Sequence, residues 1–257
     1  MTHLVDDLGE PVPLSGPASR VVSLVPSLTE ALEVSAPGRL AGATDYCTHP
    51  STLDVPRVGG SKYPKLDRVL DLAPDLVLAN SEENRQEDVE RLRANGIPVW
   101  VMTAAASVPA ALGSLRRILT QACELDEPGW LVEAEELWRE TRPVRFHAVV
   151  PVWRKPWIVL GRDTFGGDVL RRVGVANVYA GSAERYPRPD VEELRAHLRA
   201  DADLLVLPDE PYLFTAEDGP DHFPDARYAL VSGRHLTWYG PSLVEAHTAL
   251  TEALGGG

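Results

Sequence analysis

The chain has 257 residues, of which 44% are hydrophobic and 25% are charged. Its formal net charge is −13 and its isoelectric point is about 5.0. A surface this acidic repels nucleic acids and anionic membranes, so neither is an expected partner. The hydrophobic share is sufficient for one large or two small folded domains, and no apolar run is long enough for membrane insertion.

The first predicted element is a strand at residues 21–25 that feeds a helix. Pro26 follows the strand, Ser27 stands where an N-cap is expected, and Glu30 lies three residues later, which is the spacing of a capping box. This helix therefore begins at the carboxyl end of a buried strand, which is where open α/β sheets bind ligands. The chain contains no glycine-rich phosphate-binding motif of the G-x-G-x-x-G or Walker type.

Strands and helices continue to alternate through residue 140. Further strands are predicted at 40–43, 76–79 and 98–102, and helices at 28–34, 66–72, 87–94, 108–123 and 130–140. Repeated β and α units of this kind predict a parallel sheet that helices cover on both faces.

The second half of the chain repeats this alternation. Strands are predicted at 146–152, 158–160 and 204–207, and helices at 165–173, 191–198 and 242–254. Two more strands, 228–231 and 236–239, flank Ser232-Gly233, which is typical of a hairpin turn. A short opening hairpin is also predicted where Asp7-Leu8-Gly9 precedes Val12.

Several motifs occur in a characteristic order along the chain. They are VPSLTE at 25–30, VGG at 58–60, LAPDLVLA at 72–79, FGGDVLRRVGVAN at 165–177, RYP at 185–187, LPDEPYLF at 207–214 and LTWYG at 236–240. This succession resembles the solute-binding proteins that serve importers of cobalamin, haem and ferric siderophores. They are the class III periplasmic binding proteins, also called helical-backbone metal receptors.

The resemblance implies an α/β fold of two Rossmann-like lobes with parallel-rich sheets, joined by a single connecting helix. The expected boundaries are 1–124 for the N-terminal lobe, 125–143 for the connecting helix and 144–257 for the C-terminal lobe. The implied function is solute binding of the ABC-importer type. The solute would be cobalamin, haem, a ferric siderophore or another large planar molecule, held in the cleft between the lobes, and no resident cofactor is required.

A ligand-binding cleft of this kind is built from loops that follow strands. Trp153 and Trp157 surround two cations, a pattern that suits a flat conjugated ligand with carboxylates or amides, unless the rings pack on the core and the cations are solvated. In the cobalamin binders that the chain resembles, a tryptophan follows the region matching Gly59-Gly60, where Ser61-Lys62-Tyr63 stands here. The ligand-binding candidates are Pro26, Ser27, Tyr46, Lys62, Tyr63, Glu83, Trp153, Arg154, Trp157, Arg185, Tyr186, Glu210 and Trp238.

Cys47 and His49 form a candidate metal pair in the loop after the strand at 40–43. A thiolate and an imidazole suit zinc, copper or iron, but two ligands are only half of a typical site. The alternative is a structural loop whose histidine is satisfied by neighbouring polar groups. Cys123 lies in a predicted helix and is expected to be a small core residue.

Partners and compartment follow from the resemblance and from the N-terminus. Exported relatives dock on a membrane permease through acidic residues, for which Glu82, Glu83 and Glu87 are candidates, although the family position falls at Gln86. The chain as it stands shows no signal peptide or lipidated cysteine, so we expect a cytoplasmic location, or a periplasmic or cell-surface one if a leader was removed.

The second hypothesis is a cytoplasmic sensor, carrier or enzyme on the same scaffold. The chain has no G-x-S-x-G elbow, no H-E-x-x-H motif and no assignable acid–base pair, so we expect no catalytic residues. The protein is expected to be a monomer whose main partner is its small-molecule ligand.

Overall fold

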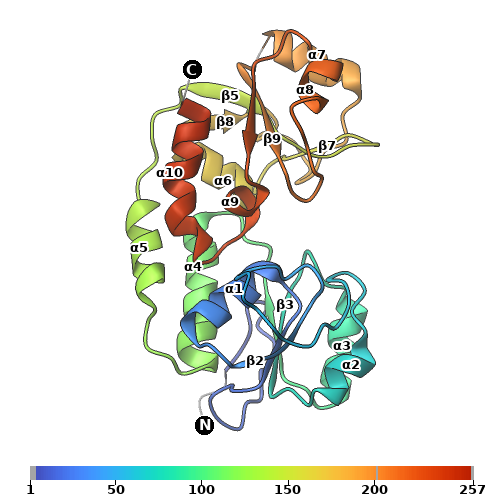
Figure 1. Ribbon diagram of the computed structural model, residues 1–257, viewed down its shortest axis with the longest axis vertical. Coiled ribbons are helices and arrows are strands. Elements are labelled where there is room, and N and C mark those ends of the chain that lie inside the picture. Colours follow the sequence, from blue (N-terminus) through green and yellow to red (C-terminus); the bar gives the residue numbers. More distant parts are fainter. Residues whose placement is uncertain (1–3, 201, 256–257) are drawn as a thin grey trace. The chain divides into compact units, whose positions relative to one another are not determined.

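A computed structural model describes residues 4–200 and 202–255, and Figure 1 shows their helices and strands, most of them labelled. The chain divides into two compact units. Unit 1 consists of Met1–Ala104, Leu112–Glu133 and Tyr239–Pro241, and unit 2 consists of Ala105–Ala111, Ala134–Trp238 and Ser242–Gly257. Each unit contains a parallel sheet, which confirms the predicted α/β class with two lobes.

The sheet of unit 1 has four parallel strands in the order β2-β1-β3-β4. These are β1 (Val21–Ser23), β2 (Leu40–Ala43), β3 (Leu76–Asn80) and β4 (Val99–Met102). Every residue of β1, β3 and β4 is buried. Continuous apolar runs are typical of parallel strands covered on both faces, which is why the sequence predicts all four strands.

Three helices connect these strands: α1 (Pro26–Ser35), α2 (Leu66–Asp71) and α3 (Gln86–Ala94). The predicted capping box at the start of α1 is wrong. The N-cap is Val25, which makes no side-chain cap, and Ser27 is already inside the helix and buried. Pro26 explains the shift, because its fixed φ suits the first helical position and it lacks the amide hydrogen that a cap would satisfy.

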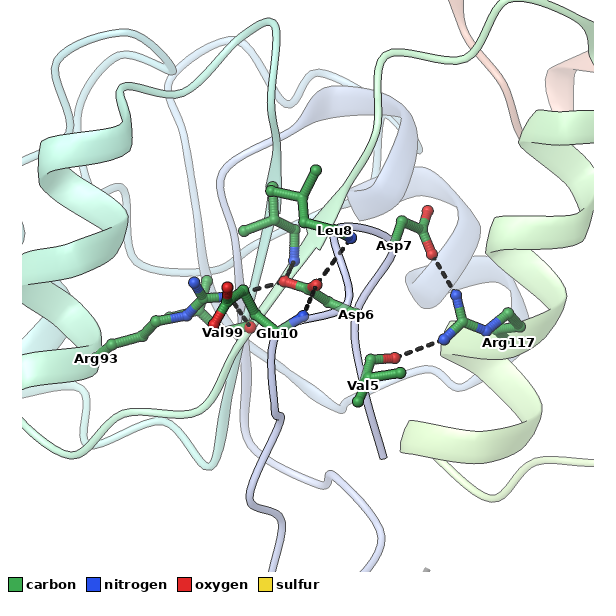
Figure 2. Close-up of polar contacts among 9 residues, drawn as sticks. Val5, Asp6, Asp7, Leu8, Glu10, Arg93, Val99 and Arg117 are labelled. Carbon is green, nitrogen blue, oxygen red and sulfur yellow. Dashed lines mark hydrogen bonds and ion pairs between the residues drawn. The ribbon is translucent and has the colours of Figure 1, made fainter. Parts of the chain in front are cut away.

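The N-terminal segment forms the predicted opening hairpin and belongs to unit 1 (Figure 2). The buried carboxylate of Asp6 accepts hydrogen bonds from the amides of Leu8 and Glu10, and pairs with Arg93 at 2.7 Å. Asp7 pairs with Arg117, also at 2.7 Å. Two acidic residues therefore fasten the hairpin to helices that lie far along the chain.

The sheet of unit 2 also has four parallel strands, in the order β10-β9-β5-β8. They are β5 (Phe146–Val149), β8 (Val175–Asn177), β9 (Leu204–Pro208) and β10 (Tyr228–Val231). The helices are α6 (Phe165–Arg172), α7 (Val191–Ala200), α8 (Asp218–His222), α9 (Gly233–Thr237) and α10 (Ser242–Gly255). A separate antiparallel hairpin consists of β6 (Pro151–Trp153) and β7 (Ile158–Val159).

Two predictions for unit 2 are wrong. The strand expected at 146–152 is broken at Val150, and its second part leaves the main sheet to form β6. The hairpin expected around Ser232-Gly233 is a strand-to-helix turn, since β10 pairs in parallel with β9 and helix α9 follows. Gly233 has a different role here, because a Cβ on it would lie 2.5 to 2.8 Å from atoms of Glu210.

Two of the boundaries between the units fall within the helices at 108–137. Helix α4 (Val108–Arg117) continues as a π-helical turn, η1 (Ile118–Ala122), and α5 (Gly129–Leu137) follows. Both α4 and α5 have residues in each unit. The lobe boundaries at 124 and 143 stay predictions. In residues 4–200 and 202–255, no helix has both the length and the apolar character needed to cross a membrane.

Candidate functional site

The two sheets share one topology, which defines a candidate position in each unit. In unit 1, β1 lies between β2 and β3, so the chain reverses its direction of winding between β1 and β3. In unit 2, β5 lies in the same way between β8 and β9. Ligands of open α/β sheets bind at the carboxyl ends of the strands beside such a switch point. The relevant loops therefore follow β1 and β3 in unit 1, and β5 and β9 in unit 2.

Two asparagines organise the loop after β3. The backbone amide of Asn80 donates to Asn84 Oδ1 at 2.8 Å, and the amide of Glu82 donates to Asn80 Oδ1 at 2.8 Å. Asn84 Nδ2 donates to the carbonyl of Ser61 at 2.8 Å. Both asparagines are buried. This network joins the Glu82-Glu83 loop to the loop that carries Lys62 and Tyr63, two of the predicted site residues.

Unit 1 exposes two tyrosines near these loops. Tyr46 is 65% exposed and Tyr63 is 66% exposed. Tyr46 lies beside Gly60, where an added Cβ would be 3.5 Å from its ring, and the guanidinium of Arg85 lies 4.7 Å from the centre of the Tyr63 ring. Lys62 is exposed next to Tyr63. The structure therefore gives unit 1 two aromatic faces and two cations at the carboxyl edge of its sheet.

Glu83 is the titratable group of this loop. Burial raises the pKa of Glu83 to about 7, and the negative charge of Glu82 adds to the effect. The carboxyl is therefore close to half protonated at neutral pH.

Pro26 and Ser27, at the end of β1, provide little exposed surface, because Ser27 is buried in the first turn of α1.

The candidate metal pair is divided by burial. The thiol of Cys47 is completely buried and lies 2.9 Å from Thr29 Oγ1 and 3.1 Å from Thr44 Oγ1. Burial raises the pKa of Cys47, so the thiol stays protonated. The ring of His49 is half-buried, with Nδ1 3.1 Å from Thr48 Oγ1. These contacts favour the structural-loop alternative, and metal binding by the pair stays a prediction.

Cys123 is buried and free, as expected for a core residue. Among residues 4–200 and 202–255, no group of three or more His, Cys, Asp or Glu side chains could hold a metal ion. Unit 1 has a hollow of about 280 Å³ lined by Pro56, Arg57, Val58, Arg68, Asp71 and Leu72. None of the predicted site residues lines this hollow.

In unit 2, the two tryptophans of the β6–β7 hairpin have different surroundings. Trp153 is 43% exposed and makes an edge contact with Tyr212, with ring centres 5.7 Å apart. Trp157 is half-buried and stacks on Phe214 at 6.2 Å with an interplanar angle of 7°. Trp153 is therefore the ring that a solute could contact, whereas Trp157 packs on the core of unit 2, as the alternative reading of the sequence anticipated.

Arg154 is held within unit 2. Its guanidinium forms an ion pair with Asp218 and a hydrogen bond with Nε2 of His222, and it lies 5.8 Å from the centre of the Trp157 ring. Burial alone would raise the pKa of Asp218. Hydrogen bonds from Thr215 and the contact with Arg154 together outweigh burial and keep this pKa below its ordinary value. The charge of Arg154 is therefore largely matched before any ligand binds.

The remaining candidates of unit 2 lie on two further loops. Arg185 donates to the carbonyl of Asp163, and Tyr186 is half-buried beside it. In the loop after β9, Glu210 Oε2 accepts a hydrogen bond from the indole N–H of Trp238 at 3.1 Å. Trp238 is 7% exposed, so it supports the Glu210 loop through this hydrogen bond and offers little surface to a ligand.

Sequence reasoning did not identify Asn80 and Asn84 as organising residues of the candidate site. Their spacing of four residues after a strand was the available signal, since asparagine side chains often bond to nearby backbone groups. The longer connections of the same network, from Asn84 to Ser61, join residues that no sequence pattern relates.

Comparison with known proteins gives a consistent picture. A model of the family described as "Periplasmic binding protein" matches residues 21–140. The chain is 26% identical over 195 residues to the vitamin B12-binding protein of Vibrio parahaemolyticus, covering 69% of this chain and 67% of the relative. It is also 26% identical to the vitamin B12-binding protein of Yersinia pseudotuberculosis, covering 74% of this chain and 69% of that protein.

Two solved structures illustrate the likeness of fold. The periplasmic haem-binding protein RhuT from Roseiflexus sp. RS-1 superposes with a TM-score of 0.71 at 20% identity, covering 92% of this chain and 99% of that one. The periplasmic vitamin B12-binding protein BtuF of Vibrio cholerae has a TM-score of 0.69 at 18% identity, covering 93% and 97%. At these identities the structures support the fold, and the relatives above support the resemblance found in the motifs.

Proposed function

We propose that this chain, a member of the periplasmic binding protein family, binds a metal chelate or another large planar solute through the loops at the carboxyl edges of its two sheets. The family consists of solute-binding proteins rather than enzymes, and relatives over two thirds of the chain are vitamin B12-binding proteins. The observation that carries the proposal is the exposure of large aromatic side chains in these loops: Tyr46 and Tyr63 in unit 1, and Trp153 in unit 2.

The charges of these loops support a solute with anionic or amide substituents. Lys62 and Arg85 lie beside the exposed rings of unit 1, and Arg185 lies on a candidate loop of unit 2. Flat conjugated molecules stack on exposed aromatic rings, while nearby cations attract carboxylates at their edges. Cobalamin, haem and ferric siderophores are the solutes we propose. The two exposed tyrosines of unit 1 are compatible with all three and do not distinguish them.

The test is a direct titration of the purified protein with cyanocobalamin, haemin and a ferric siderophore. Tryptophan fluorescence should report binding, because Trp153 is exposed in the proposed site and would be quenched by a coloured planar ligand. Visible absorption and native mass spectrometry of freshly purified protein would show whether a solute co-purifies. If none of the three solutes quenches the fluorescence of the folded protein, the proposed ligand class is contradicted.

The proposed partner is the permease of an importer, and the proposed compartment is the periplasm or the cell surface. The structure offers Glu87, which pairs with Arg85 at 2.5 Å, and Gln86, which donates to Glu90 at 2.7 Å, at the beginning of α3. Co-purification with a candidate permease, compared between the wild-type chain and a Glu82→Gln/Glu87→Gln variant, tests the partner. Fractionation of cells that express the natural gene tests the compartment. We propose that the protein binds its solute as a monomer.

A further inference from the structure

Two consecutive residues, Trp238 and Tyr239, belong to different units. The indole N–H of Trp238 donates to Glu210 in unit 2 at 3.1 Å. The hydroxyl of Tyr239 accepts a hydrogen bond from Asn80 Nδ2 in unit 1 at 2.8 Å. A single peptide bond therefore connects the residue that holds the Glu210 loop to the residue that holds the end of β3.

Asn80 and Glu210 occupy corresponding places in the two sheets. Asn80 is the last residue of β3, and Glu210 lies two residues after the end of β9. Strands β3 and β9 each lie beside the switch point of their own sheet. The dipeptide therefore reaches the equivalent candidate loop in each unit.

Tyr239 is firmly anchored in unit 1. Its ring is buried, and its hydroxyl is also hydrogen-bonded to Ser27 in the first turn of α1. Burial, together with the nearby charge of Glu83, raises the pKa of Tyr239, so the hydroxyl keeps its proton. Gly240 follows closely packed on α1, since a Cβ there would lie 3.3 Å from the carbonyl oxygen of Ser27.

Trp238 is equally well fixed in unit 2. It ends helix α9, which begins at Gly233 directly against the Glu210 loop. The amide of Gly233 donates to Asp209 Oδ1 at 2.6 Å, and the indole then closes the contact at the other end of the helix. The helix and the loop are therefore joined at two places, so a displacement of one should move the other.

We propose that Trp238 and Tyr239 are positioning residues that couple the Glu210 loop of unit 2 to the Asn80–Asn84 network of unit 1. When a solute orders one loop, the free-energy cost of ordering the other loop should fall. The buried contacts of the dipeptide would restrict the motion of the second loop once the first is fixed. This coupling rests on the proposed function for its biological meaning, but its structural part can be tested without any solute.

The first experiment measures hydrogen exchange of the backbone amides of Asn80 and Glu82 in unit 1, using the Trp238→Phe variant. This change removes the indole N–H in unit 2 and keeps a large ring. We expect exchange at both amides to become about threefold to tenfold faster, which is the range for losing one hydrogen bond's net contribution. The matched control is Trp138→Phe, because Trp138 is buried in unit 2 and its indole donates to the carbonyl of Leu243 at 2.8 Å instead of to Glu210.

Equal exchange of the two unit 1 amides in Trp238→Phe and Trp138→Phe would overturn the coupling. If Trp238→Phe does not fold, Glu210→Ala removes the acceptor of the same hydrogen bond and is measured in the same way. Faster exchange at Asn80 and Glu82 in that variant supports the proposal, and unchanged exchange contradicts it.

The second experiment compares affinity in Tyr239→Phe and Tyr179→Phe for whichever of cyanocobalamin and haemin binds the wild-type chain. Tyr179 is a buried tyrosine of unit 2 whose hydroxyl donates to Glu193 at 3.1 Å, so it controls for the loss of a buried phenol hydrogen bond. We expect Tyr239→Phe alone to weaken binding, by about threefold to tenfold. Equal affinities in the two variants would contradict the positioning role. A wild-type chain that binds neither probe counts against the proposed function, and the exchange experiment still decides the coupling.

Discussion

The loops after β1 and β3 in unit 1 are held by neutral amides, whereas the hairpin after β5 and the loop after β9 in unit 2 are held by an ion pair and packed rings. In unit 1, Asn80 and Asn84 satisfy backbone groups of three loops, which include Leu24, Ser61 and Glu82. In unit 2, Arg154 pairs with Asp218, and Trp157 packs on Phe214. The strand order is the same in both units, so the topology fixes where the loops lie and leaves their chemistry open.

This difference has a consequence for the response to pH. Neutral amide hydrogen bonds do not titrate, so unit 1 should respond mainly through Glu83. The contacts of Arg154 include a histidine, His222, so the β6–β7 hairpin of unit 2 should respond through the protonation of that ring. His247, whose pKa burial also lowers, acts in the same direction elsewhere in unit 2. The Glu83 loop is therefore expected to lose stability as the pH rises, and the β6–β7 hairpin as the pH falls.

The largest expected effect is that of Asn84→Ala in unit 1. The variant loses the acceptor for the buried Asn80 amide and the donor to the partly buried Ser61 carbonyl, and leaves both groups without these partners. We expect the free energy of unfolding to fall by about 3 kcal/mol. Urea unfolding followed by circular dichroism measures it.

Asn95→Ala is the matched control for this prediction. Asn95 is exposed and its amide donates to the Arg91 carbonyl at the end of α3 at 2.8 Å. Removing a surface amide should change the stability by less than about 0.5 kcal/mol. Similar losses in Asn84→Ala and Asn95→Ala would show that the buried network does not organise unit 1.

The next effect concerns Glu83, whose pKa is about 4.5 in the unfolded chain and about 7 in the folded protein. Between these values the folded state keeps a proton that the unfolded state has released, so stability falls as the pH rises from 4.5 to 7. The full rise in pKa corresponds to about 3.4 kcal/mol, and solvent screening of the partly exposed side chain reduces this. Glu83→Gln removes the penalty and should stabilise the protein by about 2 kcal/mol at pH 8, with little effect near pH 4.

Thermal unfolding of wild-type and Glu83→Gln protein across this pH range measures the effect. Glu82→Gln serves as the comparison, because the charge of Glu82 raises the pKa of Glu83 less than burial does. Its effect should have the same sign and a smaller size. A stabilisation that is the same at pH 4 and pH 8 would rule out the titration of Glu83 as its origin.

The sequence was informative where structure depends on local patterns. The four strands of unit 1 are short apolar runs with helical segments between them, and the hairpin at Asp7-Leu8-Gly9 has a glycine with φ of +83° where the turn requires it. Loops after strands could also be assigned to the candidate site, because parallel topology brings the carboxyl ends of strands to one edge. Exposed Tyr46, Tyr63 and Trp153 lie on such loops.

The sequence was uninformative where a side chain finds its partner far along the chain. The sequence makes Arg154 a candidate cation for the ligand and gives no sign that Asp218, 64 residues away, matches its charge. The sequence makes Cys47 a candidate metal ligand and gives no sign that its thiol contacts Thr29, 18 residues earlier. Tyr239 meets Asn80 across 159 residues. Such pairings follow from tertiary packing, which no local pattern encodes.

The smallest expected effect concerns His222 in unit 2. Nε2 of the ring faces the guanidinium of Arg154, so the folded state favours the neutral ring. Burial and the charges of Arg154 and Arg195 lower its pKa, while Asp218 and Asp221 act in the opposite direction. The unfolded chain takes up a proton near pH 6.5, whereas the folded ring resists it, so stability should fall as the pH drops below about 6.5.

Protonating His222 should loosen the β6–β7 hairpin in particular, because a charged ring repels the Arg154 guanidinium that lies beside the Trp157 ring. His222→Gln removes the titration and keeps an oxygen that can accept from Arg154. Between pH 7 and pH 5.5 we expect the free energy of opening at the Val159 amide to fall by about 1 kcal/mol in the wild-type protein and to stay constant in His222→Gln. Hydrogen exchange, corrected for the intrinsic rate at each pH, measures this. An equal fall in both proteins would place the acid sensitivity at another group, and the contrast between the two units would then not depend on the Arg154–His222 contact.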